Sequence, residues 1–264
     1  MMMKKVDFKD LTFLIPVRLD SIIRLENLLA SIDSINETFD TNVYVLESCS
    51  YKNKLLERIL PNNVKYVFIE DKDPIFYRTY YLNYMVYNVQ TDYLAIWDAD
   101  VIIDAKQLIE AINALRNHDY DVAFPYNGYF YDTSEIIREI YLVTKDKAVL
   151  FNNINKMLLP YGHNTTGGAI LLNRKSYINA GMENENFYGW VPEDVERYVR
   201  WKNLGYKIFR SKGPLFHLTH PRDINGRYNS DLQKKNGFYY LREMANCSAA
   251  EIQKIVTSES FRSL

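Results

Sequence analysis

Three pairs of aspartates separated by one residue are the first candidates for chemistry in this sequence. Such a D-x-D triplet can hold a divalent cation against a diphosphate, because its two carboxylates supply hard oxygen ligands and the metal screens the phosphate charge. The pairs are Asp71 and Asp73, Asp98 and Asp100, and Asp119 and Asp121. Three copies in one chain make the triplet a weak signal by itself, so the surrounding elements must decide between them.

A further acidic pair opens a predicted helix. Pro192 suits the first helical turn, since a missing N–H costs nothing there, and Glu193 and Asp194 follow it directly. The positive end of the helix dipole favours an ionised carboxylate, which is the form that a general base requires at neutral pH. Acidic residues in a first turn are also common helix stabilisers, so the pair alone leaves both interpretations open.

Two histidines near the end of the chain are the third feature. The imidazoles of His217 and His220 are good ligands for borderline cations such as Mn²⁺ and Zn²⁺. Pro221 argues against a helix here, so joint ligation would need a bent loop, and His220 alone is the stronger candidate from spacing. The other two histidines, His118 and His163, have no supporting context, and we assign them to surface or structural positions.

The first half of the chain alternates strand-like and helix-like segments. Apolar or β-branched runs predict strands at residues 11–17, 42–46, 64–69, 93–97 and 122–125. Helical patterns lie between them at residues 22–35, 51–60, 77–89 and 105–116, the first of them following Asp20 or Ser21 as N-cap. This alternation predicts an α/β fold with a mixed, mostly parallel sheet flanked by helices.

Sheet topology ranks the three triplets, because ligands of such sheets lie beyond the carboxyl ends of the strands. Asp119 and Asp121 precede their strand, whereas Asp71 and Asp73 follow one and are topologically permitted. We favour the remaining triplet, Asp98 and Asp100, because it follows the apolar strand 93–97 and lies deeper in the alternating pattern of strands and helices. The competing interpretation is that Asp98 or Asp104 only caps the next helix.

The second half is less regular. Residues 130–159 are predicted to be helix and loop with no clear apolar stripe. A strand at 168–173, a helix at 193–204 closed by Gly205, strands at 206–210 and 215–218, and one or two helices from residue 231 follow. We expect a single domain over 1–264, with a nucleotide-binding half at 1–125, an acceptor and catalytic half at 126–229 and a helical tail at 230–264.

Composition narrows the classes of function. The formal net charge of -1 gives no basic excess for binding nucleic acid, and 47% hydrophobic residues argue against disorder. No apolar run approaches the roughly 20 residues of a membrane span, and residues 1–8 lack the apolar core of a signal peptide. With two distant cysteines, we expect a soluble cytoplasmic protein. Its many tyrosines and phenylalanines leave peripheral association with the inner membrane face open, and its oligomeric state is also open.

Taken together, five segments in order resemble the inverting β-1,4-galactosyltransferase type of the glycosyltransferase A fold. They are Ile15-Pro16-Val17-Arg18, Phe76-Tyr77-Arg78 with Leu82-Asn83, Trp97-Asp98-Ala99-Asp100, Gly167-Gly168 through Tyr188-Gly189-Trp190 to Glu193-Asp194, and His217 with His220. The ordered set is far more specific than any one motif. The opening segment also resembles the bacterial transferases that build capsule and cell-surface polysaccharide.

The resemblance implies a role for each matching residue. Pro16, Val17, Arg18, Phe76 and Arg78 match nucleotide contacts, Asp98 matches the acid facing the donor, and Gly168, Trp190 and Glu193 match positions around the donor and acceptor sugars. Asp100 and His220 match metal ligands, while His217 falls where the family has a methionine ligand. The resemblance therefore implies that both histidines bind the cation, Mn²⁺ or another divalent ion. Asp194 matches the catalytic base.

The function that this resemblance implies is metal-dependent, inverting transfer of a hexose from a UDP-sugar to a hydroxyl of a glycan acceptor, in surface polysaccharide synthesis. Galactose or N-acetylgalactosamine as the sugar follows only from analogy. The family's glycines after the tryptophan are replaced here by Val191 and Pro192, and a basic residue expected after Arg18 is replaced by Asp20. The alternatives are a nucleotidyltransferase, against which the lack of glycine at 16–20 counts, and a non-catalytic carbohydrate-binding protein.

Overall fold

The alternating apolar runs of the first half form the parallel part of a seven-stranded sheet in a computed structural model that describes residues 5–222, 224–228, 230–258 and 261. The strand order is β3-β2-β1-β4-β8-β6-β9. The strands are β1 (Val6–Val17), β2 (Phe39–Cys49), β3 (Val64–Glu70), β4 (Tyr93–Trp97), β6 (Val122–Phe124), β8 (Ala169–Asn173) and β9 (Ile208–Arg210). Strands β1 to β4 pair in parallel, and β8 runs antiparallel to β4 and β6. The predicted mixed, mostly parallel sheet is confirmed.

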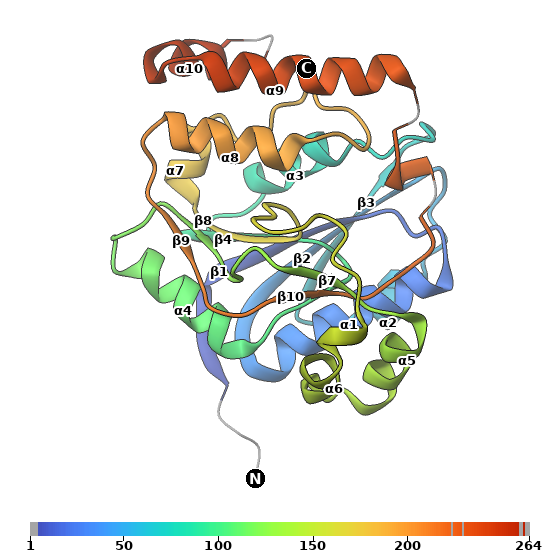
Figure 1. The fold of residues 1–264 in the computed structure, drawn as a ribbon. Coiled ribbons are helices and arrows are strands. Elements are labelled where there is room, and N and C mark those ends of the chain that lie inside the picture. The colour runs from blue at the N-terminus through green and yellow to red at the C-terminus, as the bar shows by residue number, and fades with distance from the viewer. Residues whose placement is uncertain (1–4, 223, 229, 259–260, 262–264) are drawn as a thin grey trace.

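Helices cover both faces of this sheet (Figure 1). On one side lie α1 (Ile22–Thr38), α2 (Leu55–Ile59) and α4 (Ala105–Arg116), and on the other lie α3 (Arg78–Tyr87), α7 (Arg174–Asn179) and α8 (Glu193–Asn203). Ser21, not Asp20, is the N-cap of α1, since its side chain accepts the N–H of Arg24. The helix predicted at 51–60 is shorter than expected, because Lys54 at its N-cap adopts a left-handed φ of 62°.

A second, three-stranded sheet joins distant parts of the chain. It has the order β5-β10-β7, formed by β5 (Val101–Ile102), β10 (Leu215–His217) and β7 (Phe130–Asp132). In its register His217 lies opposite Val101 on one side and Asp132 on the other. Three segments, the outermost more than a hundred residues apart in the chain, therefore meet just beyond the end of β4.

Residues 130–159, for which no stripe was predicted, contain β7 and three short helices: α5 (Glu135–Thr144), α6 (Lys147–Asn152) and the 3-10 helix η1 (Ile154–Lys156). Ile137 and Tyr141 of α5 are buried in a small apolar cluster with Leu150 and Phe216. This cluster packs the helices beneath β10 and fixes the position of the second sheet.

The C-terminal segment forms a third layer over α8 (Figure 1). As predicted, it contains two helices, α9 (Asp231–Asn246) and α10 (Ala249–Val256), and the short 3-10 helix η2 (Ile224–Gly226) precedes them. Gly237 lets α9 approach the segment before α8, since an added Cβ would lie 3.0 Å from Pro192 Cδ. Among the described residues, no helix has both the length and the apolar character needed to cross a bilayer.

Candidate active site

The carboxyl end of β4 places the favoured triplet. Trp97 is buried, and its indole N–H donates to Ser31 Oγ at 3.1 Å, which anchors the last residue of the strand. Beyond it, the Asp98 N–H donates to the Gly168 carbonyl at 2.9 Å. Gly168 has a φ of 86°, and an added Cβ would lie 2.9 Å from Leu215 Cδ1, so a glycine is required where this turn meets β10.

Asp100 and two histidines form a compact triangle of ligand atoms. Asp100 Oδ1 lies 3.5 Å from His217 Nε2, and Asp100 Oδ2 lies 3.1 Å from His220 Nε2. All three ligand atoms lie within 4.8 Å of one another. The chain bends after β10, as joint ligation requires, and both imidazoles reach Asp100. Ligation of a cation by both histidines, which the resemblance implies, stays a prediction.

The electrostatics of the triangle reflect this close approach. Burial opposes ionisation of Asp100, but the neighbouring His217 and His220 hold its pKa well below the usual value. Burial likewise lowers the pKa of His217, yet Asp100 and Asp132 outweigh it and raise that pKa to about 9. A divalent cation between these groups would replace the proton, because two imidazoles and a carboxylate suit a borderline metal ion.

The far nitrogen of each histidine is already occupied. Asp132 Oδ1 lies 2.8 Å from His217 Nδ1, and His220 Nδ1 lies 2.9 Å from the Pro221 carbonyl. Such partners fix the ring orientation of metal-binding histidines and leave Nε2 for the metal. The residues present therefore fit a divalent cation. No feature of the sequence indicated that Asp132 belongs to the site, because its partner His217 is 85 residues away in the chain.

A separate acidic group lies at the start of α8. The side chains of Glu193 and Asp194 are 12% and 25% exposed, and one guanidinium nitrogen of Arg78, Nη1, lies 3.7 Å from each of them. Arg78 also donates to Asp98 Oδ1 at 2.8 Å, and Arg197 donates to Asp194. Burial, followed by the neighbouring Asp194, raises the pKa of Glu193 to about 8. Because two like charges this close repel each other, the protonated form of Glu193 is favoured beside Asp194.

Gly167 makes room for Asp194. A Cβ added at Gly167 would lie 2.4 Å from Asp194 Oδ2, too close for any side chain. The Gly-Gly pair after residue 166 therefore serves two separate contacts: Gly167 admits the carboxylate and Gly168 admits β10. The first contact was not predicted, because the packing partner lies on another element.

One cleft of about 500 Å³ contains every residue to which the resemblance gives a role. These residues are Pro16, Val17, Arg18, Phe76, Arg78, Asp98, Asp100, Gly168, Trp190, Glu193, Asp194, His217 and His220. The cleft wall also includes residues that the sequence did not mark, among them Tyr161, His163, Arg222 and Tyr228. His163, which we assigned to a surface or structural position, is exposed at this wall, with its ring 4.6 Å from that of Tyr129.

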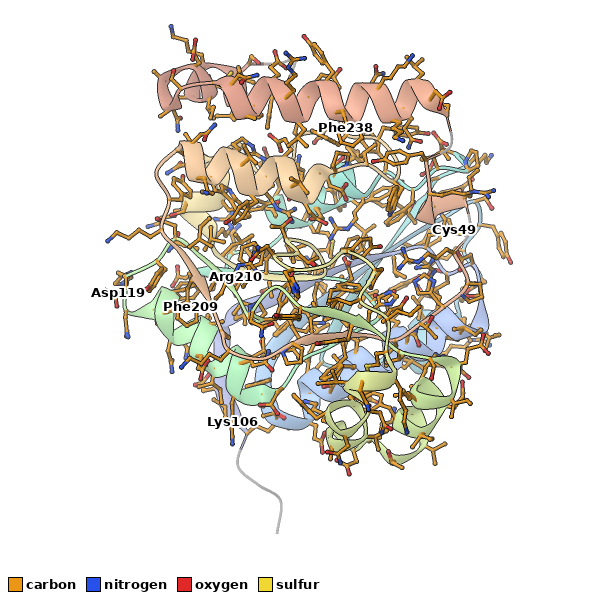
Figure 2. All side chains as sticks on the ribbon, in the orientation of Figure 1. Cys49, Lys106, Asp119, Phe209, Arg210 and Phe238 are labelled. Atoms are coloured by element: carbon orange, nitrogen blue, oxygen red, sulfur yellow. The ribbon has the colours of Figure 1, made fainter. Side chains whose placement is uncertain are left out.

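The other acidic triplets have structural partners. Asp71 accepts from Arg18 at 2.9 Å and from the Tyr81 hydroxyl at 2.5 Å, so this triplet orients Arg18. Asp121 accepts from Ser176, and Asp119 lies at the outer edge of the molecule (Figure 2). The capping role is taken by Asp104, which accepts the Lys106 N–H at the start of α4.

Comparison with known proteins gives the fold. No family model matches the chain. A stretch of 124 residues, 47% of this chain, is 28% identical to β-1,4-galactosyltransferase 7 of Homo sapiens and of Mus musculus. This match spans only 28% of the length of those relatives.

Solved structures match over most of the chain. Glucosyl-3-phosphoglycerate synthase from Mycobacterium tuberculosis, in complex with Mn²⁺, UDP and phosphoglyceric acid, has a TM-score of 0.55 at 11% identity, covering 90% of this chain and 79% of that one. A mutant of Drosophila β-1,4-galactosyltransferase 7, in complex with manganese, UDP-galactose and xylobiose, has a TM-score of 0.52 at 14% identity, with the same two coverages. The chain has the glycosyltransferase A fold, and the resemblance drawn from its motifs is confirmed.

Proposed function

We propose that this protein is a metal-dependent, inverting glycosyltransferase that moves a hexose from a UDP-sugar to a hydroxyl of a glycan acceptor. One observation carries the proposal: a triangle of cation ligands and a separate, partly exposed carboxylate lie in the same cleft. The ligand triangle can hold a cation against the diphosphate of the donor, and the separate carboxylate can deprotonate the acceptor hydroxyl.

In this mechanism Asp194 is the general base. Its carboxylate accepts the proton of the acceptor hydroxyl as that oxygen attacks the anomeric carbon, which inverts the configuration there. Asp194 lies in the first turn of α8, and the Arg197 guanidinium donates to its carboxylate and orients it. Glu193, whose pKa is raised to about 8, is largely protonated at neutral pH and can donate a hydrogen bond to a sugar hydroxyl beside it.

The other end of the cleft takes the nucleotide. Pro16, Val17, Arg18 and Phe76 line it, and the Arg18 guanidinium lies 5.6 Å from the centre of the Phe76 ring. Arg78 contacts both Asp98 and Asp194, and Arg78 and Asp98 can bind the donor sugar and its phosphates. A cation held by Asp100, His217 and His220 would supply Lewis-acid stabilisation of the charge on the leaving diphosphate.

The compared proteins support this choice of donor and metal. The Mycobacterium tuberculosis synthase is described with Mn²⁺ and UDP, and the Drosophila enzyme with manganese and UDP-galactose. From the resemblance of the motifs, and in agreement with UDP-galactose in the Drosophila enzyme, we propose galactose or N-acetylgalactosamine as the sugar. The resemblance of the opening segment to bacterial transferases leads us to propose surface polysaccharide as the product and the cytoplasm as the compartment. Residues 1–125 would then bind the nucleotide, residues 126–229 the acceptor, and the tail would support both.

The test uses a panel of nucleotide sugars with Mn²⁺, scored for slow donor hydrolysis and, with oligosaccharide acceptors, for transfer. Asp194→Asn should abolish turnover and leave metal-dependent UDP binding nearly intact. Transfer at the wild-type rate by this variant would exclude Asp194 as the base. Preference for a nucleoside triphosphate would favour a nucleotidyltransferase, and glycan binding without metal or UDP affinity would favour a carbohydrate-binding protein.

A further inference from the structure

The two carboxylate oxygens of Asp194 have different surroundings. Oδ1 accepts a hydrogen bond from the guanidinium of Arg197, and Arg78 Nη1 lies 3.7 Å from the same oxygen. In the part of the chain that the structure describes, no hydrogen bond reaches Oδ2, which packs against Gly167. Because the side chain lines the cleft and is 25% exposed, Oδ2 is the oxygen that is available to a ligand.

Arg197 is a buried cation that bridges two carboxylates. It lies one helical turn after Asp194 in α8, and its side chain is only 1% exposed. Its Nη1 donates to Glu183 Oε1 at 2.5 Å, while its Nη2 donates to Asp194. Because a guanidinium is planar and rigid, its two terminal nitrogens keep a fixed relation to each other. The position of Glu183 therefore determines where the nitrogen that binds Asp194 lies.

Glu183 is itself fixed from several sides. Its carboxylate, 1% exposed, accepts from the Tyr177 hydroxyl, and its backbone N–H and carbonyl bind the Asn83 side chain at 2.9 and 3.0 Å. The Arg197 Cζ also lies 5.4 Å from the ring centre of the buried Trp201. None of these five residues lines the cleft. Arg197 is thus held by a rigid frame behind the cleft wall.

We propose that Glu183 and Arg197 are positioning residues that direct Oδ2 of Asp194 at the acceptor hydroxyl. Because Arg197 occupies Oδ1, Oδ2 takes the proton as the acceptor oxygen attacks the anomeric carbon. The leaving diphosphate keeps the electron pair of its bond to that carbon. Glu183 has no recorded contact with Asp194, so it acts through Arg197 alone. This inference rests on the proposed function and adds to it the reacting oxygen and the residues that orient it.

The experiment is a double-mutant cycle on the full-length chain with Mn²⁺ and the donor and acceptor that react fastest in the panel above. Arg197→Gln should lower kcat about 10- to 100-fold, as expected for a misplaced reacting group, with the donor KM and the affinity for UDP unchanged. Glu183→Gln should cause a smaller loss, because glutamine still accepts one N–H. The double variant should be no slower than Arg197→Gln, and it leaves no unpaired buried charge to oppose folding.

The matched control replaces Glu196 and Arg200 by glutamine together, since they form a second buried pair in α8, 2.9 Å apart, with no recorded contact to Asp194. Per folded molecule, measured by denaturant unfolding, this control should keep the wild-type kcat. Additive losses in the cycle, wild-type kcat in the Glu183 and Arg197 double variant, or an equal loss in the control would overturn the inference and leave the proposed function standing. A wild-type chain that neither transfers sugar nor binds UDP with Mn²⁺ would overturn both.

Discussion

At the scale of single residues, Glu193 is a carboxyl with a strongly raised pKa. Its carboxyl is largely buried beside Asp194 and Arg78, and the cost of burial exceeds the attraction of the arginine, so its pKa rises to about 8. A carboxyl that keeps its proton in the folded state and loses it in the unfolded state stabilises the fold at low pH. That contribution is complete below the unfolded pKa of about 4.3 and is lost as pH rises through 8.

We therefore predict that Glu193→Gln flattens the dependence of stability on pH. The amide cannot ionise, so the variant should lack a slope of up to about 1.4 kcal/mol per pH unit between pH 5 and 8. Denaturant unfolding at several pH values measures this, with Glu135→Gln, an exposed first-turn carboxyl of α5, as control. Parallel curves for Glu193→Gln and the wild type would show that Glu193 ionises normally.

Sequence reasoning found the residues whose neighbours in the chain carry a signal. Asp98 and Asp100 follow an apolar strand, and Asp194 opens a helix after a proline, so local pattern was enough to propose them. Asp132 and Arg222 have no such context. Each is placed in the site by a contact more than sixty residues away, one with His217 and the other with Tyr161. Pairings of this kind depend on the folded sheet order, which a single sequence does not contain.

At the scale of elements, the local sequence pattern was enough to set the bounds of α4 but not those of α5. The predicted helix 105–116 and strand 93–97 match α4 and β4 residue for residue, because each has one apolar face or a fully apolar run. Helix α5 lies within residues 130–159, which were predicted as helix and loop without helix bounds, because its apolar residues do not share one buried face: Ile137 and Tyr141 are buried, while Ile136 and Val143 are 72% and 83% exposed.

Helix α9 controls the segment that carries Trp190. Gln233 of α9 donates to the Tyr188 carbonyl at 2.9 Å, and Gly237 packs against Val191 and Pro192. A methyl group at position 237 would lie 3.0 Å from Pro192 Cδ, so the segment would have to move by a few tenths of an ångström. This contact gives a packing reason for a glycine within a helix, where glycine costs about 1 kcal/mol relative to alanine.

We predict that Gly237→Ala weakens UDP binding by several-fold while changing the melting temperature little, because better helix propensity offsets the crowding. Trp97 and Trp201 are fully buried, so a change in tryptophan emission on UDP binding would report mainly on Trp190. Asn236→Ala, at an exposed position of the same helix, should bind UDP as the wild type does. Unchanged affinity in Gly237→Ala would mean that α9 does not position the Trp190 segment.

At the scale of the whole molecule, the cleft is a junction of distant segments. Its walls come from the end of β1, the turn after β4, the start of α8 and the segment after β10, which span residues 16 to 228. A ligand that contacts several of these segments binds only the folded chain. Its binding free energy must then add to the stability of the whole fold.

We predict that UDP and Mn²⁺ together raise the melting temperature, each alone having a smaller effect. At a ligand concentration 100 times the Kd the gain is about 2.7 kcal/mol, and a chain of this size should then melt roughly 5–10 °C higher. Chelation of the metal should reverse the metal-dependent part, and His220→Ala should abolish it, since one of the three ligands is lost. Replacing UDP by ADP tests whether the cleft recognises the uracil ring. An equal rise in melting temperature with ADP would contradict a uridine-specific cleft, whereas a smaller rise would support it.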